Sequence, residues 1–210
     1  MRIIEPRVEI IDPINADEIY RKLELCGRVC YKSESRITEE SAEKFLKGII
    51  KSGHESVLEH VSITARFICD RGVSHEIVRH RLASYSMESQ RYCNYGKDRE
   101  VTFIKPCFNP KTLPYNEWKN ACFVSEDEYF ILLAMGHKPE EARAVLNNSV
   151  KTELIMTANI REWRHFFRLR CAKSAHPQMR QVAMMLLEQM YEKLPVLFED
   201  VWSEVVGDEK

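Results

Sequence analysis

A basic and hydroxyl-rich segment spans residues 79–92, where the sequence reads RHRLASYSMESQRY. Arg79, Arg81 and Arg91 carry guanidinium groups, which bind phosphate or carboxylate through two parallel charge-assisted hydrogen bonds. The serine and tyrosine hydroxyls among them add further donors. Glu88 does not suit a pure anion site, and we expect it to accept a hydroxyl or ring N–H of the same ligand. The segment therefore predicts a site for a phosphorylated small molecule whose other end carries polar groups.

A second basic cluster consists of Arg161, Arg164, His165 and Arg168. At steps of three and four residues these side chains share one face of a helix, where like charges destabilise the isolated helix. The face must therefore bind an anion or pair with acids of a neighbouring element. Both interpretations stay open from these residues alone. For the first segment, too, a solvated basic turn after a helix remains an alternative.

Residues 53–60 read GHESVLEH and superficially resemble a zinc-protease helix. That motif needs two histidines four residues apart on one helical face, whereas His54 and His60 are separated by about 240° around a helix. We therefore predict no metal site, and expect a loop that caps a short helix, with His54 or Ser56 at the cap.

Together the three segments resemble the flavin-dependent thymidylate synthases. Residues 79–92 contain that family's RHR-x7-S motif, and residues 53–60 are similar to its GHE-[ST]-x-x-EH stretch. Residues 159–170 resemble its N-x-R … N/H … LR pattern. The likeness keeps its order and spacing over roughly residues 8–200, which makes it far more specific than any one motif.

The resemblance implies a role for each matching residue. Arg170 would contact the uracil ring and favour its ionised form, and His54 would lie near the flavin ring, so both are expected to be catalytic. The chain departs from the family pattern at Glu76, where many members carry Gln, and at Met87, where Glu or Gln is common. The implied FAD-binding residues are Ser56, Glu59, Arg79, His80, Arg81, Asn159, Arg161 and His165. The implied dUMP-binding residues are Glu76, Arg79, Met87, Glu88, Ser89, Gln90, Arg91, Arg143 and Arg170.

The implied reaction is methylation of dUMP to dTMP. FAD is the cofactor, and NADPH and methylenetetrahydrofolate are co-substrates. No cysteine nucleophile is expected, since none of the seven cysteines has a recognisable nucleophile context. Family members are homotetramers with sites built between subunits, so the resemblance also implies a homotetramer with shared active sites.

Two other classes of function remain as alternatives. A nucleotide sensor or RNA-binding module would use the same arginines, with Tyr85, Tyr92 and Tyr95 as stacking platforms. A degenerate family member would bind flavin but would have lost turnover.

Charge and cysteine content narrow the class of partner. Lys plus Arg number 31 against 32 Asp plus Glu, which gives a formal net charge of -1. A nucleic-acid-binding domain usually has a basic excess, so we expect no nucleic-acid polymer as partner. An odd number of cysteines without a CxxC pair is typical of reduced thiols in the cytosol. Because no apolar run approaches the ~18–20 residues that span a bilayer, and the start lacks a signal-peptide pattern, we expect a cytoplasmic protein without a membrane partner.

The elements that must position these residues can be read from periodicity. At 210 residues we expect a single compact domain over 1–210. Strands and helices mix without regular βαβ alternation, which predicts an α+β fold with a mixed sheet packed against several amphipathic helices. Residues 152–157 are ambiguous between strand and helix. We expect strands at 3–11, 61–69 and 101–104, and helices at 16–29, 38–52, 74–82, 115–135, 160–169 and from 177 onward.

Overall fold

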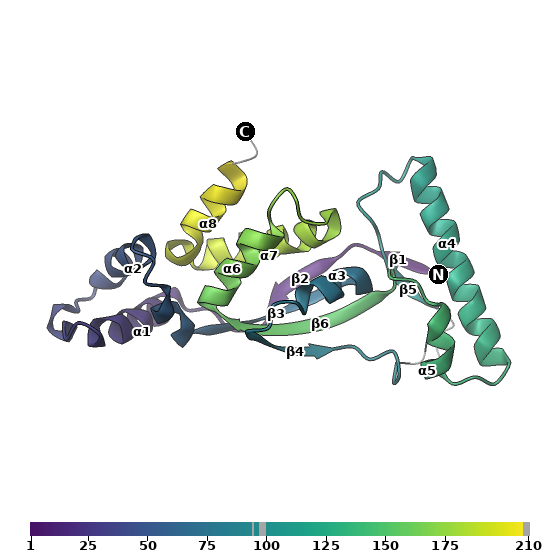
Figure 1. The fold of residues 1–210 in the computed structure, drawn as a ribbon, viewed down its shortest axis with the longest axis horizontal. Coiled ribbons are helices and arrows are strands. Elements are labelled where there is room, and N and C mark those ends of the chain that lie inside the picture. Colours follow the sequence, from purple (N-terminus) through teal and green to yellow (C-terminus); the bar gives the residue numbers. More distant parts are fainter. Residues whose placement is uncertain (94, 97–99, 208–210) are drawn as a thin grey trace. The chain divides into compact units, whose positions relative to one another are not determined.

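Two sheets organise the computed structural model, which describes residues 1–93, 95–96 and 100–207 (Figure 1). The smaller sheet pairs β1 (Arg2–Ile4) with β5 (Thr102–Ile104) in parallel. The larger sheet has the strand order β2-β3-β6-β4. Its strands are β2 (Arg7–Ile10), β3 (Ser62–Asp70), β6 (Lys151–Asn159) and β4 (Ala83–Met87).

Helices of varied length are interspersed among these strands without a repeating order, which confirms the predicted α+β class. None of the described helices is long and apolar enough to cross a membrane. The α-helices are α1 (Ala16–Val29), α2 (Ser41–Lys51), α3 (Arg71–Ile77), α4 (Leu113–Ala134), α5 (Pro139–Ala142), α6 (Ile160–Arg170), α7 (Pro177–Lys193) and α8 (Pro195–Gly207). The 3-10 helices are η1 (Glu34–Arg36), η2 (Glu55–His60) and η3 (Arg143–Val145).

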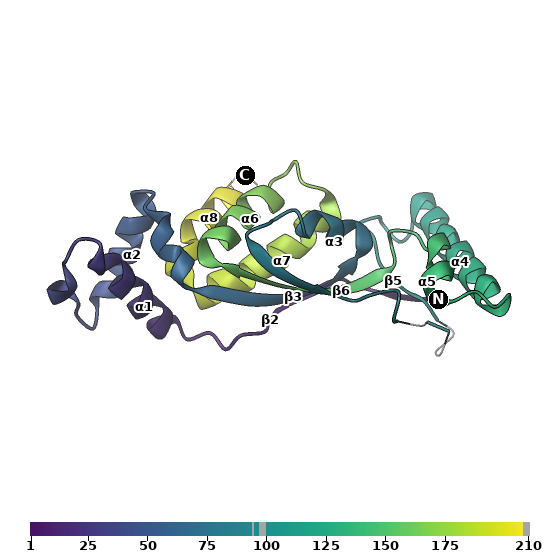
Figure 2. The same ribbon diagram turned by 60° about the horizontal axis from the view of Figure 1, so that its bottom comes forward.

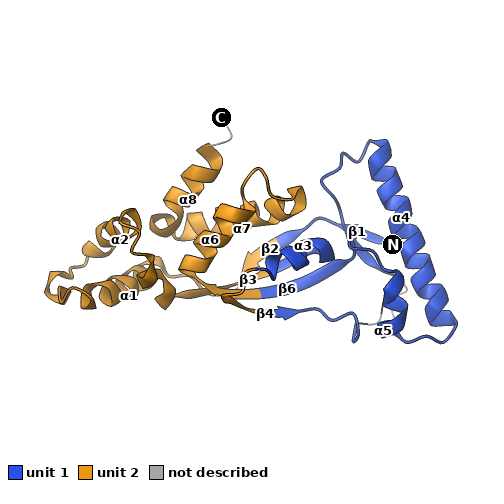
Figure 3. Cartoon of the chain, in the orientation of Figure 1, with its two compact units in different colours: residues 1–7, 67–79, 85–155 blue, residues 8–66, 80–84, 156–210 orange. Residues whose placement is uncertain are grey.

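The chain divides into two compact units, coloured separately in Figure 3. Each of the four strands of the larger sheet has residues in both units. The single domain over 1–210 stays a prediction. Unit 1 comprises residues 1–7, 67–79 and 85–155, and unit 2 comprises residues 8–66, 80–84 and 156–210.

The core of unit 1 forms where α4 packs on β5. Cys122 and Tyr129 of the helix are buried with Phe103 of the strand. Glu126, on the same helix, accepts the backbone N–H of Val101 at 2.7 Å, and so joins the helix to the segment entering the strand. Gly136 follows the C-terminal end of α4 and has a φ of 91°, a conformation that favours glycine.

The core of unit 2 is built around α6, with α7 and α8 gathered beside it (Figure 2). Trp163, Phe166 and Phe167 are fully buried. The indole N–H of Trp163 donates to the carbonyl oxygen of Ile63 at 3.0 Å, which fixes α6 on β3. The ring of Phe167 meets that of Phe198 at 5.8 Å between centroids, which ties α6 to α8. The apolar stripe of α7, which includes Met179, Val182 and Leu186, is buried.

Two predicted elements were wrong. Residues 3–11 are not one strand but β1 and β2, which belong to different sheets and are separated around Pro6, a residue without a backbone N–H for a ladder. The helix expected over 74–82 is α3, displaced toward the N-terminus. It begins earlier because the side chain of Asp70 caps it, accepting the N–H of Val73 at 2.8 Å. At the C-terminal end of α3, the hydroxyl of Tyr85 donates to the carbonyl oxygen of Ile77, the last residue of the helix.

Local contacts and burial explain other elements. Asn15 caps α1 by accepting the N–H of Glu18 at 3.3 Å. The ambiguous residues 152–157 lie in β6. The strand predicted at 61–69 is β3, and its residues are buried in alternation over most of its length.

Candidate active site

The RHR segment lies in the link between α3 and β4, so it does not end a helix as expected. Arg79 and Arg81 are exposed, whereas His80 between them is only 4% exposed. The imidazole is buried against Glu162 and Arg170 of α6, at 3.1 Å from each. Burial lowers the pKa of His80, the hydrogen bond to Glu162 opposes this change, and the charge of Arg170 reinforces it. His80 is therefore a neutral, enclosed residue of unit 2.

Two predicted nucleotide ligands in unit 1 converge on one acid. Nε of Arg91 lies 3.5 Å from Oε2 of Glu140, and Nε of Arg143 donates to the backbone carbonyl of the same residue at 3.2 Å. The Arg91 side chain is 57% exposed and that of Glu140 41%. The guanidinium of Arg91 is therefore accessible to water and to dissolved anions.

The turn after β4 gathers further predicted residues. The Ser89 hydroxyl accepts the backbone N–H of Arg91 at 3.3 Å, and Gln90 is buried. Met87 ends β4 with 40% of its surface exposed. Glu76 lies in the last turn of α3, where its carbonyl oxygen accepts the N–H of Arg79 at 3.3 Å.

Glu88 is paired within unit 1. The ammonium of Lys151 donates to it at 2.8 Å and to Glu153 at 2.6 Å. Burial alone would lower the pKa of Lys151, but the hydrogen bonds to Glu153 and Glu88 outweigh burial and raise it. The ammonium of Lys151 thus orients the Glu88 side chain.

A pocket of about 360 Å³ in unit 2 brings together His54, Ser56 and Arg161. Gly53, with φ 70°, makes the tight turn that follows α2 and delivers this segment to the pocket. The hydroxyl of Tyr31 lies 3.3 Å from Nδ1 of His54. Pockets of ~300–1,000 Å³ are typical of small-molecule sites, so this one is at the lower end.

Arg161, which lines this pocket, and Asn159, which precedes α6, are predicted FAD ligands that are held by polar contacts. Arg161 donates to Glu59 at 2.6 Å. The amide oxygen of Asn159 caps α6 by accepting the N–H of Glu162 at 2.8 Å. His165 is exposed on α6, and its ring lies 5.7 Å from that of His80 between centroids.

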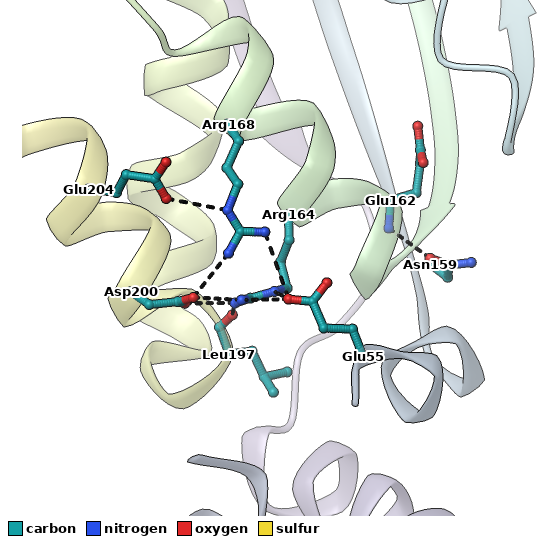
Figure 4. A network of polar contacts seen from close by, with 8 residues as sticks. All are labelled: Glu55, Asn159, Glu162, Arg164, Arg168, Leu197, Asp200 and Glu204. Carbon is teal, nitrogen blue, oxygen red and sulfur yellow. Dashed lines mark hydrogen bonds and ion pairs between the residues drawn. The ribbon is translucent and has the colours of Figure 1, made fainter. Parts of the chain in front are cut away.

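The remaining arginines of the basic face are paired with acids (Figure 4). Arg164 is fully buried and donates to Asp200 at 2.6 Å, to Glu55 at 3.0 Å and to the carbonyl of Leu197. Arg168 donates to the same aspartate at 3.1 Å. Burial opposes the charge of Asp200, but the hydrogen bonds and charge of Arg164 outweigh burial and lower the pKa of this carboxyl. For Arg164 and Arg168, the interpretation that the basic face pairs with acids of neighbouring elements is therefore confirmed.

Buried cysteines of the chain are poor nucleophiles. Burial raises the pKa of Cys171 to about 12, and it also raises the pKa of Cys69 and Cys122. A thiol that stays protonated does not attack carbon.

Several of the predicted residues thus fall into four groups, and the residue that completes each group was missing from the sequence prediction. Glu140 joins Arg91 and Arg143, and Lys151 holds Glu88. Tyr31 reaches His54, and Glu162 holds His80. A signal for Glu162 was visible but ambiguous, because an acid in the first turn of a helix is ordinarily explained by the helix dipole.

Comparisons with known proteins agree with the motifs. The family described as thymidylate synthase complementing protein, Thy1, matches residues 14–196. The flavin-dependent thymidylate synthase of Pyrococcus furiosus is 39% identical over 167 residues, which cover 78% of this chain and 68% of the relative. That of Geobacter sulfurreducens is 34% identical over 183 residues, covering 84% and 79%. That of Corynebacterium aurimucosum is 32% identical over 210 residues, covering 92% and 84%. The chain therefore belongs to the Thy1 family of flavin-dependent thymidylate synthases.

Proposed function

We propose that the chain carries out the reaction of its family, methylation of dUMP to dTMP, with methylenetetrahydrofolate as carbon donor and NADPH as reductant of FAD. The observation that carries this proposal is the extent of the family match. Residues 14–196 include every residue for which we propose a role. Bound FAD would supply the hydride that completes the methyl group.

The pocket of unit 2 offers groups suited to a flavin nucleotide. Ser56 brings a hydroxyl, Arg161 a guanidinium and His54 an imidazole to one cavity. These groups hydrogen-bond to ring carbonyls or to phosphate. We propose FAD contacts for Ser56, Glu59, Arg79, His80, Arg81, Asn159, Arg161 and His165, with His54 beside the reacting ring.

For dUMP we propose a phosphate site at Arg91 and Arg143, with Arg79 as a further cation. The 3.5 Å contact between Arg91 and Glu140 is long and exposed. Such pairs contribute only ~0–1 kcal/mol, so a phosphate dianion can displace the carboxylate. We propose that Glu76, Met87, Glu88, Ser89 and Gln90 contact the rest of the nucleotide.

Arg170 is our candidate for activating the uracil. Without a thiolate adding to the ring, C5 must gain nucleophilic character by another route. A fixed cation at the ring edge stabilises negative charge that develops there. Arg170 ends α6 and its Nε is already bound to His80, so its guanidinium is oriented.

We further propose a cytoplasmic homotetramer with shared active sites. The seven cysteines are all free, which suits a reducing compartment. A pocket of only about 360 Å³ is small for a complete flavin nucleotide, which supports completion by a partner subunit. Sedimentation equilibrium tests the assembly, and a monomer at micromolar concentration with full activity would contradict it.

Tritium release from dUMP labelled at C5 tests the reaction. FAD, NADPH and methylenetetrahydrofolate are added together and then omitted one at a time. Release that requires all three supports the proposal. A flavin-loaded protein without release would identify a degenerate member. Absence of both tritium release and flavin binding would contradict the proposal and favour the alternative in which the arginines belong to a nucleotide sensor.

A further inference from the structure

Glu162, His80 and Arg170 form a continuous chain of hydrogen bonds within unit 2. Oε1 of Glu162 lies 3.1 Å from Nδ1 of His80, and Nε2 of His80 lies 3.1 Å from Nε of Arg170. Glu162 is 7% exposed and His80 4%, whereas Arg170 is half-buried. The chain therefore runs from a buried acid to the guanidinium proposed to contact uracil.

The direction of each hydrogen bond follows from the chemistry of arginine. A guanidinium N–H can only donate, so Nε2 of His80 must be an unprotonated acceptor. The single proton of a neutral imidazole then lies on Nδ1 and is donated to Glu162. Burial lowers the pKa of His80, in agreement with this neutral form.

The geometry of α6 explains why a residue from another segment is needed. Glu162 and Arg170 lie on the same helix, separated by about 12 Å along its axis and about 80° around it. His80 bridges this interval from the link between α3 and β4. Its ring packs on Phe166, with 4.8 Å between centroids, which limits rotation of the imidazole plane.

We propose that Glu162 and His80 are positioning residues for Arg170. Glu162 selects the tautomer of His80 whose Nε2 accepts from Arg170, and the guanidinium is thereby oriented before dUMP arrives. Preorganised charge is more effective than charge that must reorient during the reaction. The inference rests on the proposed function, deepens it by adding Glu162, and makes the contribution of the His80 ring nitrogens indirect.

A divalent metal is the competing explanation of the same cluster. The ligand atoms of His80, Glu162 and His165 lie within 4.8 Å of one another. However, one nitrogen of His80 faces the permanent charge of Arg170, and its other nitrogen carries a proton. A metal ligand needs a lone pair directed at the ion, so we favour the hydrogen-bonded chain.

Glu162→Ala and Glu162→Gln test the first bond of the chain. We expect the alanine variant to lose roughly tenfold to a hundredfold in kcat for tritium release, by analogy with other groups that orient a histidine. Dissociation constants for FAD and dUMP should stay within about threefold, because the contact affects orientation rather than binding. The glutamine variant should keep most of the kcat, since its amide oxygen still accepts the Nδ1 proton. Glu199→Ala is the matched control, because Glu199 forms an exposed surface pair with Lys47.

His80→Gln and His80→Phe test the second bond, and they decide the matter if Glu162→Ala does not fold. The glutamine oxygen can accept from Arg170, whereas phenylalanine only fills the space. We expect a higher kcat for His80→Gln. Equal kcat in the two variants, or wild-type kcat in Glu162→Ala, would overturn the proposal, as would a loss confined to FAD affinity. Stoichiometric metal that disappears in Glu162→Ala would support the competing explanation instead.

An NMR measurement keeps the inference testable even if the wild type releases no tritium, which is how failure of the proposed function would appear. In protein labelled with 15N-histidine, His80 is assigned by its absence from His80→Gln. We expect the chemical shifts of a neutral ring protonated on Nδ1 at pH 7. A ring protonated on Nε2, or on both nitrogens, would refute the chain.

Discussion

Arg170 combines an ordinary location, the last turn of a helix, with an unusual constraint on its guanidinium. We predict that Arg170→Ala lowers the rate of tritium release on the order of a hundredfold or more, the usual cost of removing a charge that stabilises a transition state. FAD affinity should change little, since the pocket with Ser56 and Arg161 is lined by other residues. Single-turnover assays and flavin titration measure the two effects. Arg170→Lys should be intermediate, because it keeps the charge but loses the planar fork. Loss of FAD from the alanine variant would contradict the assignment.

Arg91 has the opposite character, because its side chain is 57% exposed and only loosely held by Glu140. We predict that Arg91→Ala raises the Kd for dUMP roughly tenfold to a hundredfold, the value of a charged hydrogen bond, with FAD binding unchanged. Isothermal titration with dUMP and with deoxyuridine separates the phosphate contribution from that of the base. The effect should vanish for deoxyuridine. Arg36→Ala, at another exposed arginine, is the control, and an unchanged dUMP affinity in Arg91→Ala would count against a phosphate role.

At the scale of elements, Arg164 joins η2 to α6 and α8 through Glu55, Asp200 and Leu197 (Figure 4). We predict that Arg164→Met destabilises the fold by about 3 kcal/mol, because it removes the buried donors to Glu55, Asp200 and the carbonyl oxygen of Leu197 and leaves only Arg168 beside the two acids. Urea unfolding measures the change. Lys47→Met breaks the exposed pair with Glu199 and should cost at most about 1 kcal/mol. Equal effects of the two substitutions would show that burial does not set the cost.

The same element explains how far sequence reasoning reached. The repeating basic residues of α6 predicted a helix close to the observed one. The pairing of His80 with Glu162 was not predictable, because 82 positions separate them and no local pattern records such a contact. The same holds for Arg164 and Asp200, which are 36 positions apart. The helix boundary near the RHR segment failed for a local reason, since Asp70 was available as a cap but also ends a strand.

At the scale of the whole chain, the proposed ligands are distributed unevenly between the two units. Most residues proposed for dUMP belong to unit 1, and most proposed for FAD belong to unit 2. Arg170 is an exception, since it belongs to unit 2 but is proposed to contact the nucleotide. The family match spans both units, so neither alone represents the proposed enzyme.

The stability of the whole molecule should depend on pH through His80. Burial lowers its pKa in the folded state, a change opposed by Glu162 and reinforced by Arg170 and His165, which face it from α6. The unfolded chain therefore binds the proton more readily, and the free energy of unfolding must fall as pH decreases below the ordinary histidine value of 6.5. Each pKa unit of separation would contribute about 1.4 kcal/mol once the pH lies below both values. Urea unfolding at pH 7.5, 6.5 and 5.5 measures the slope. Because the chain contains seven histidines, the informative quantity is the difference from His80→Gln. In that variant the free energy of unfolding should fall less steeply as the pH decreases. An identical pH dependence in the two proteins would mean that folding does not lower the pKa of His80.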